Sequence, residues 1–254
     1  MRRLLAAAAI AALVTGCAST PAPVAVAPDA PWIAAAVADA DRPQTERDRD
    51  TLRKPAEVLA FAGISPGQEV LDIIPGTGYF TRLFAEAVGP TGKVYAYVPT
   101  ELVGKFNSDG LAKGLAAAYP NVEYASDPLA QAAPGPIADV VFTAQNYHDF
   151  HTPYFEGSDI VAINRALYSV VRPGGALVII DHVAQAGSGL RDVSTLHRID
   201  PEAVKRELSA AGFVLEAESE ILRNPADPRT ANVFDPSIRG RTDQFMLRFR
   251  KPAR

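Results

Sequence analysis

Residues 70–99 read VLDIIPGTGYFTRLFAEAVGPTGKVYAYVP, and they decide the fold. The apolar run from Glu69 to Ile74 predicts a buried strand, and the glycines after it predict a tight turn. An amphipathic segment, Tyr79 to Val88, predicts a helix that ends at Gly89-Pro90, and Lys93 to Val98 predicts a second strand. A strand, a glycine turn, a helix and another strand form the unit from which parallel sheets are built.

The same alternation continues toward the C-terminus. Further strands are predicted at 122–124, 138–143, 176–181, 213–221 and 243–249. Helices are predicted within 101–118 and at 160–171 and 201–211. Because no helix separates the last two strands, they are expected to form an antiparallel edge. We therefore predict an α/β fold with a seven-stranded, mostly parallel Rossmann-like sheet and helices on both faces.

The first residues carry the pattern of an export signal. Arg2 and Arg3 precede an apolar stretch, Leu4 to Val14, that is too short to span a bilayer. The stretch runs into Val14-Thr15-Gly16-Cys17, which resembles a bacterial lipoprotein signal. Residues 1–17 are therefore predicted to be a lipoprotein-type signal peptide, with a lipid anchor at Cys17. A plain secretory signal, cut elsewhere, is the alternative.

The remaining chain is predicted to be one domain behind a tether. Residues 18–30 are rich in Ala and Pro and are expected to be flexible. Residues 31–254 form the domain, with 31–54 as a helical extension. The chain has 254 residues, 48% apolar and 21% charged, and a net charge of −4, without the basic stripe of a nucleic-acid binder. We expect export to the periplasm, with the outer membrane contacted only through the anchor.

The glycine turn carries the first functional signal. Asp72 to Gly78 reads D-x-I-x-G-T-G at the carboxyl end of the first predicted strand. Glycines at this point let a ligand approach the backbone, and the next helix offers free N–H groups. The spacing differs from the dinucleotide motif G-x-G-x-x-G, and the Gly-Lys-Ser/Thr of a phosphate loop is absent.

This turn resembles that of the class I S-adenosylmethionine-dependent methyltransferases. Three further stretches are similar to the same superfamily, namely Gly89–Lys93, Val171–Gly175 and Leu208–Phe213. The resemblance implies the strand order 3-2-1-4-5-7-6 and S-adenosylmethionine as cofactor. More narrowly, Asn146–Asp149 and Thr195–Asp200 resemble secreted bacterial proteins that are labelled predicted methyltransferases.

The resemblance also implies which residues hold the cofactor. They are Asp72, Gly76, Thr77, Gly78, Glu101, Asp127 and Asn146. The sequence departs from the superfamily at two positions. Ile74 stands in place of the first glycine of the turn. Val98 stands where an acid would bind the ribose, so Glu101 is expected to replace that acid.

The four histidines all follow predicted strands, so they are expected to face one cleft beyond the sheet. His148 and His182 are the candidate acid/base groups, with Asp149 and Asp181 to orient a ring. His148-x-x-His151 with a distant His is a second interpretation, a metal site. Structural roles are the third. We predict acid/base catalysis without a metal.

These patterns together predict an S-adenosylmethionine-dependent methyltransferase that acts on an unknown small molecule by His-assisted methyl transfer. One alternative is a non-catalytic ligand-binding module of the cell envelope on the same fold. Another is a His-based metal-dependent enzyme. Neither the substrate nor the oligomeric state can be read from the sequence.

Overall fold

A computed structural model of the protein describes residues 26–131, 137–155 and 159–253. The predicted signal peptide, Cys17 and most of the predicted tether lie outside these residues. In the described ranges, every helix is too short or too polar to cross a membrane.

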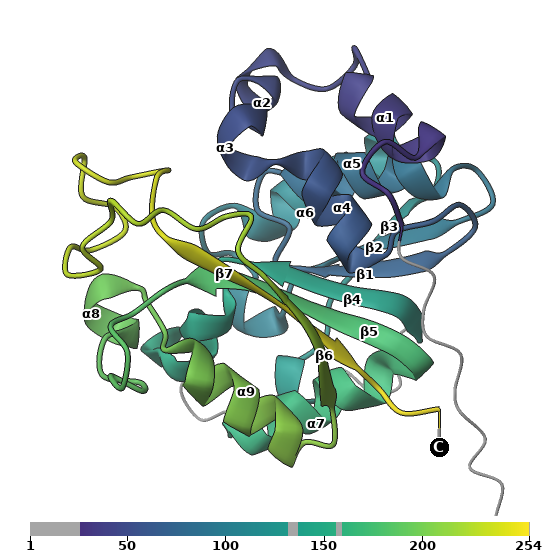
Figure 1. Ribbon diagram of the computed structural model, residues 1–254. Coiled ribbons are helices and arrows are strands. Elements are labelled where there is room, and N and C mark those ends of the chain that lie inside the picture. Colours follow the sequence, from purple (N-terminus) through teal and green to yellow (C-terminus); the bar gives the residue numbers. More distant parts are fainter. Residues whose placement is uncertain (1–25, 132–136, 156–158, 254) are drawn as a thin grey trace, which may run out of the picture.

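One seven-stranded sheet organises the domain (Figure 1). Its strands are β1 (Glu69–Ile73), β2 (Lys93–Tyr97), β3 (Val122–Ala125), β4 (Ala138–Ala144), β5 (Val171–His182), β6 (Val214–Ser219) and β7 (Gln244–Arg250). They lie in the order β3-β2-β1-β4-β5-β7-β6. β7 runs antiparallel to both β5 and β6, and the other neighbours pair in parallel. The predicted fold class and strand order are confirmed.

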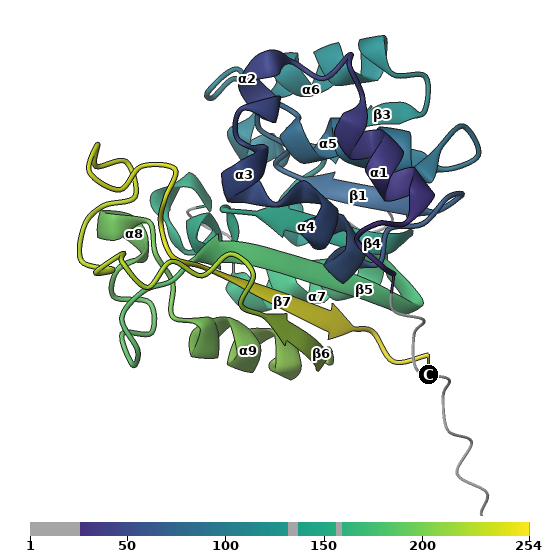
Figure 2. The same ribbon diagram turned by 45° about the horizontal axis from the view of Figure 1, so that its top comes forward.

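Helices cover both faces of this sheet (Figures 1 and 2). On one side lie α1 (Pro31–Ala38), α2 (Gln44–Arg47), α3 (Asp50–Arg53), α4 (Pro55–Ala62), α5 (Tyr79–Val88) and α6 (Ser108–Ala118). The other side carries α7 (Ile160–Val170) and α9 (Pro201–Ala210), and the short α8 (Val193–Leu196) lies near one end of the sheet. Pro43 lies between α1 and α2 and directly precedes α2.

Aromatic packing joins α5 to the centre of the sheet. Phe80 and Phe84 lie one helical turn apart, and their ring centroids are 4.8 and 4.9 Å from that of Phe142 in β4. All three side chains are buried. Since buried aromatic side chains contribute large apolar areas, this contact fixes the helix that begins at the glycine turn.

β5 begins earlier than the sequence predicts, and α6 occupies only the second part of the range in which its helix was expected. β5 begins at Val171 and includes the Pro-Gly-Gly segment that was expected to precede it. Gly175 allows this, because a Cβ there would lie 2.7 Å from the carbonyl oxygen of Asp139 on the neighbouring strand. The helix expected within 101–118 starts only at Ser108, because Gly104 and the two residues before Ser108 have positive φ angles.

Gly78 ends the glycine turn and brings α6 close to it. Its φ of +92° lies in the left-handed region, and an added Cβ would lie 2.5 Å from Cδ2 of Leu115. Gly114 is the neighbour of Leu115 in the same helix, but a Cβ there would meet nothing within 4 Å. Adding a methyl group is therefore expected to destabilise the fold at Gly78 but not at Gly114.

We expect Gly78→Ala to lower the free energy of unfolding by about 1–3 kcal/mol, through backbone strain and the clash with Leu115. Gly114→Ala should raise it by roughly 0.5–1 kcal/mol, because alanine is the better helix former. Urea denaturation of the two variants measures both effects. Equal changes in the two variants would contradict the role assigned to Gly78.

Candidate functional site

The glycine turn keeps its left-handed backbone even where glycine is missing. Ile74 has a φ of +58°, next to Gly76 at +59°. A β-branched residue in this region costs about 1–3 kcal/mol and persists only when its surroundings hold it. Here the Ile74 N–H donates to the carbonyl oxygen of Tyr97 at 2.8 Å, and Nδ2 of Asn146 donates to the Ile74 carbonyl at 3.3 Å. The backbone at this position is therefore left-handed despite the branched side chain.

A cavity of about 500 Å³ opens beside this turn, which is the size of a small-molecule site. It is lined by the turn, the end of β4, the C-terminal loop between β6 and β7, and the N-terminal helices. Its lining residues include Arg49, Arg53, Asp72, Ile74, Gly76, Thr77, Phe106, Gln145, Asn146, His148, Asp149, Tyr154, His182, His197 and Phe234. Polar and aromatic side chains thus face the same space.

Five of the predicted cofactor residues lie at the turn or beside it. Asp72, Gly76, Thr77 and Asn146 line the cavity. Gly78 packs against α6 instead of facing the cavity. At Gly76 a Cβ would meet nothing within 4 Å, so the backbone at this point is open to a ligand.

The other two predicted cofactor residues are engaged elsewhere. The Glu101 carboxylate accepts a hydrogen bond from the Leu129 N–H at 3.1 Å. Asp127 is exposed, and its backbone carbonyl accepts from the Tyr97 hydroxyl at 2.7 Å. Neither is among the residues that line the cavity, and Val98 after β2 is fully buried. Ribose binding by Glu101 therefore stays a prediction.

Asp72 is a buried carboxyl at the end of β1. Burial raises its pKa to about 7, although the Thr81 hydroxyl donates to it at 2.6 Å and Arg53 is nearby. Arg53 lies 4.5 and 5.0 Å from the ring centroids of Tyr79 and Phe80, and burial lowers its own pKa to about 10. The turn thus faces one carboxyl whose pKa lies near neutral pH and one arginine cation that packs on two aromatic rings.

The fully buried Asp181 at the end of β5 holds His148. Its carboxylate accepts the His148 backbone N–H and lies 2.8 Å from Nδ1 of the same residue. Because a carboxylate only accepts, Nδ1 carries the proton and Nε2 points toward the cavity. Burial alone would lower the pKa of His148, but the charge of Asp181, the Asp149 carboxylate beside Nε2 and the hydrogen bond to Asp181 outweigh it and raise that pKa to about 10.

His182 follows Asp181 directly and lines the same cavity. Its Nδ1 lies 2.7 Å from the Thr242 hydroxyl. Burial lowers the pKa of His182 to about 3, so the ring is neutral at ordinary pH. In the tautomer that donates from Nδ1 to Thr242, Nε2 keeps a free lone pair.

The sequence predicts that all four histidines face one cleft, but only three of them line the cavity, and His151 does not. His197 joins His148 there, with Nδ1 at 3.3 Å from Nε2 of His148. Nε2 of His151 lies 3.2 Å from the Glu207 carboxylate instead. The His148-x-x-His151 pairing of the alternative metal interpretation is therefore not formed.

Two groups of cavity residues are missing from the sequence prediction. Arg49 and Arg53 come from the charged N-terminal extension, where a spacing of four residues on a helix places two side chains on one face. Phe234 comes from the long loop between β6 and β7. The length of that loop was the available signal, since long loops are usually functional or disordered.

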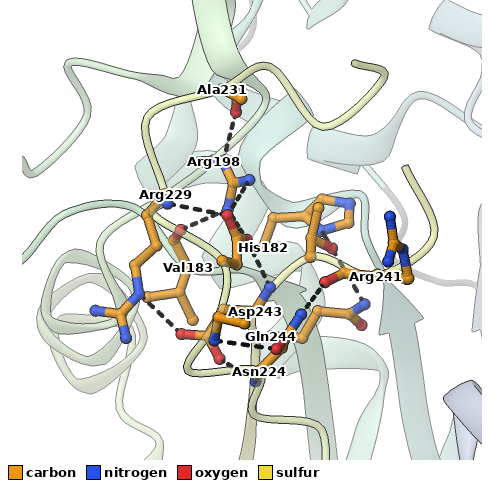
Figure 3. A network of polar contacts seen from close by, with 12 residues as sticks. His182, Val183, Arg198, Asn224, Arg229, Ala231, Arg241, Asp243 and Gln244 are labelled. Atoms are coloured by element: carbon orange, nitrogen blue, oxygen red, sulfur yellow. Dashed lines mark hydrogen bonds and ion pairs between the residues drawn. The ribbon is translucent and has the colours of Figure 1, made fainter. Parts of the chain in front are cut away.

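A buried ionic network fixes this loop (Figure 3). Arg198, with no exposed surface, donates to the Asp227 carboxylate at 2.8 and 3.1 Å and to the carbonyl oxygens of Val183 and Ala231. Asp243, also fully buried, accepts from Nε of Arg223 at 2.8 Å. Buried ion pairs and hydrogen bonds therefore tie this loop to the segment that follows β5.

Comparisons with known proteins agree with this geometry. No family model matches the chain. Among solved structures, a SAM dependent methyltransferase from Aquifex aeolicus superposes with a TM-score of 0.56 at 21% identity, over 80% of this chain and 93% of that one. The [4+2]-cyclase SpnF superposes with a TM-score of 0.57 at 17% identity, over 91% and 98%. The fold is that of the class I S-adenosylmethionine-dependent methyltransferases, and the predicted resemblance to that superfamily is confirmed.

A closer likeness covers half of the sequence. Over 127 residues the chain is 35% identical to the ubiquinone/menaquinone biosynthesis C-methyltransferase UbiE of Ectopseudomonas mendocina (strain ymp). That segment is 48% of this chain and 45% of UbiE, so the chain spans about half the length of the curated relatives it matches. The narrower resemblance to secreted methyltransferases stays a prediction.

The buried Asp72 carboxyl predicts a pH dependence of stability. Its pKa is about 7 in the folded chain against an ordinary value of 3.8, so the folded state binds more protons than the unfolded state between these values. The free energy of unfolding should therefore fall as pH rises through this window. Asp72→Asn keeps an oxygen for Thr81 and cannot ionise, so it should lose this slope. Urea denaturation at about pH 5 and about pH 8 measures it; parallel pH profiles for parent and variant would contradict the assignment.

Proposed function

We propose that the protein is an S-adenosylmethionine-dependent methyltransferase that acts on a small molecule. The observation that carries the proposal is the glycine turn: Ile74 and Gly76 both keep the left-handed backbone beside an open cavity. Strained backbone of this kind persists where function requires it. The methyltransferase likeness of half the sequence and of the whole fold supports the proposal.

The residues at the turn fit the cofactor. Asp72, Gly76, Thr77 and Asn146 would hold it, with Gly78 shaping the turn, and Arg49 and Arg53 offer cations for a carboxylate. The cofactor supplies the methyl group. The residues of the chain bind and orient the two reactants and exclude water from them.

The acceptor side of the cavity is built on the histidines. His182 is the proposed hydrogen-bond acceptor for the substrate, because its ring is neutral, its Nδ1 is held by Thr242 and it lines the cavity. Asp181 and His148 are assigned to shape this side, since the carboxylate fixes the His148 ring, and Asp149 lines it as well. A neutral imidazole of this kind orients the acceptor atom as the methyl group arrives.

The walls of the cavity favour a substrate with a flat apolar part. Phe106 and Tyr154 meet edge to face with ring centroids 5.5 Å apart, and Phe234 lies across the cavity wall near His197. Aromatic walls of this kind accept planar rings. The relatives named for quinone biosynthesis are consistent with such a substrate.

The proposed place of action is outside the cytoplasm. The pattern at residues 2–17 supports export and an anchor at Cys17, facing the periplasm from the outer membrane. Metabolic labelling with a radioactive fatty acid tests the anchor, since Cys17→Ser should abolish incorporation.

Isothermal titration calorimetry with S-adenosylmethionine and with its demethylated product tests the cofactor site. The parent is expected to bind both, and Ile74→Gly should bind more tightly because a branched side chain leaves the crevice. Gly76→Asn should bind at least tenfold more weakly, because asparagine tolerates this backbone conformation but fills the open space. Gly187→Asn is the matched control, at a positive-φ glycine whose Cβ also meets nothing within 4 Å.

The outcomes separate the alternatives. Binding by Ile74→Gly but not by the parent would show a turn that has lost its cofactor and favour the ligand-binding module. No heat from either protein would overturn the cofactor site altogether.

A further inference from the structure

Three side chains converge on one point of the cavity wall. They come from the segment after β4 and from the end of α8, and their ligand atoms lie within 4.8 Å of one another. Nε2 of His148 is 3.3 Å from Nδ1 of His197 and 3.3 Å from Oδ1 of Asp149, and the latter two atoms are 3.6 Å apart. We propose that His148, Asp149 and His197 bind a divalent metal ion, zinc above others.

The distances fit a tetrahedral ion. Zinc binds imidazole nitrogen and carboxylate oxygen at about 2.0–2.2 Å, so two ligand atoms of a tetrahedral site lie about 3.3–3.5 Å apart. An octahedral ion with ligands at about 2.1 Å would hold neighbouring atoms about 3.0 Å apart. The three observed separations are closer to the tetrahedral values. Two imidazoles and one carboxylate are also a donor set that suits zinc.

Asp181 completes the outer shell. A histidine that binds metal donates its other ring N–H to a carboxylate or carbonyl, which fixes the tautomer and the ring. Nδ1 of His148 lies 2.8 Å from the Asp181 carboxylate, and Nε2 is then the atom that faces His197 and Asp149. The buried carboxylate therefore aims Nε2 at the proposed ion, which displaces the proton that Nε2 carries in the metal-free chain.

A separate observation concerns Asp149. Its Oδ1 is buried from solvent and has no hydrogen-bond partner of acceptable geometry within the described part of the chain. A buried acceptor left unpaired costs about 1–3 kcal/mol, and a metal ion would satisfy it. His197 has a positive φ of 54°, so strained backbone presents this ligand to the same point.

Charge and coordination number point to an open site. A divalent ion balances the two carboxylates, Asp149 in its first shell and Asp181 behind it. Three protein ligands leave a fourth position, which faces the cavity that all three residues line. Zinc sites with an open position take water or a substrate oxygen, whereas structural sites have four protein ligands. The ligand class for this position is a small molecule with a hydroxyl or carbonyl oxygen.

Metal binding is measured directly, apart from the cofactor. The full chain carrying Cys17→Ser, so that no thiol competes, is freed of metal with a chelator, dialysed and titrated with zinc chloride in a calorimeter. We expect one ion per chain and a dissociation constant below about 10 µM. Cobalt in place of zinc should give the intense visible absorption of a tetrahedral site.

Four variants test the assignment. His197→Ala and Asp149→Asn should each weaken zinc binding by at least 100-fold, and Asp181→Asn should weaken it by about 10–100-fold through the ring that it orients. His151→Ala is the control: it removes the partner that the sequence spacing suggests, and affinity should stay within about twofold of the parent. Circular dichroism of the metal-free variants checks that each one folds.

Two results would overturn the site. One is a folded parent with a dissociation constant above about 0.1 mM. The other is an equal loss of affinity in His151→Ala and His197→Ala. Neither result changes the outcome of the cofactor titration, whose variants lie at the turn, so the two proposals fail separately.

Discussion

A single buried carboxylate, Asp181, organises the acceptor side of the cavity. A charge with no exposed surface is tolerated only when it is fully partnered, because an unpaired one costs several kcal/mol. Three N–H groups meet this need: the backbone and the ring of His148, and the backbone of His182. Since these groups belong to the end of β5 and to the segment after β4, the carboxylate joins two strand ends and sets the direction of the His148 ring.

Backbone strain is concentrated around the same space. Seven non-glycine residues in the described part of the chain have positive φ angles, and four of them line the cavity, namely Ile74, Phe106, Gln145 and His197. Such strain persists only where neighbouring contacts over-determine the conformation. Two hydrogen bonds provide those contacts at the turn. The Ile74 N–H donates to the Tyr97 carbonyl oxygen, and the Asn146 side-chain amide donates to the Ile74 carbonyl oxygen. More than half of the left-handed non-glycine residues in the described ranges therefore lie where ligands would bind.

Much of the fold could be predicted because strand and helix periodicity is local. The turn at Asp72–Gly78 and the apolar strands follow from neighbouring residues, and the strand order follows from the superfamily resemblance. The site was harder, because its partners are distant in sequence. Glu207 lies 56 residues from His151 and draws that ring away, whereas Asp149, adjacent to His148, joins His197. Arg49 and Arg53 belong to a charged N-terminal segment. Tertiary packing alone decides that this segment lies over the turn.

The two sides of the cavity differ in how far their residues depart from the superfamily pattern. On the cofactor side, Ile74 places a branched side chain where the superfamily has glycine, and Val98 supplies no carboxylate. The Glu101 carboxylate accepts a hydrogen bond from the backbone N–H of Leu129. On the acceptor side, by contrast, the buried polar groups are held in place: Asp181 is saturated with donors, and Thr242 holds His182. Group transfer depends on holding donor and acceptor in line. An ordered acceptor side therefore still orients the acceptor when the turn binds the cofactor less tightly. The departures from the superfamily pattern therefore bear on cofactor affinity, and they leave the histidine side of the cavity unaffected.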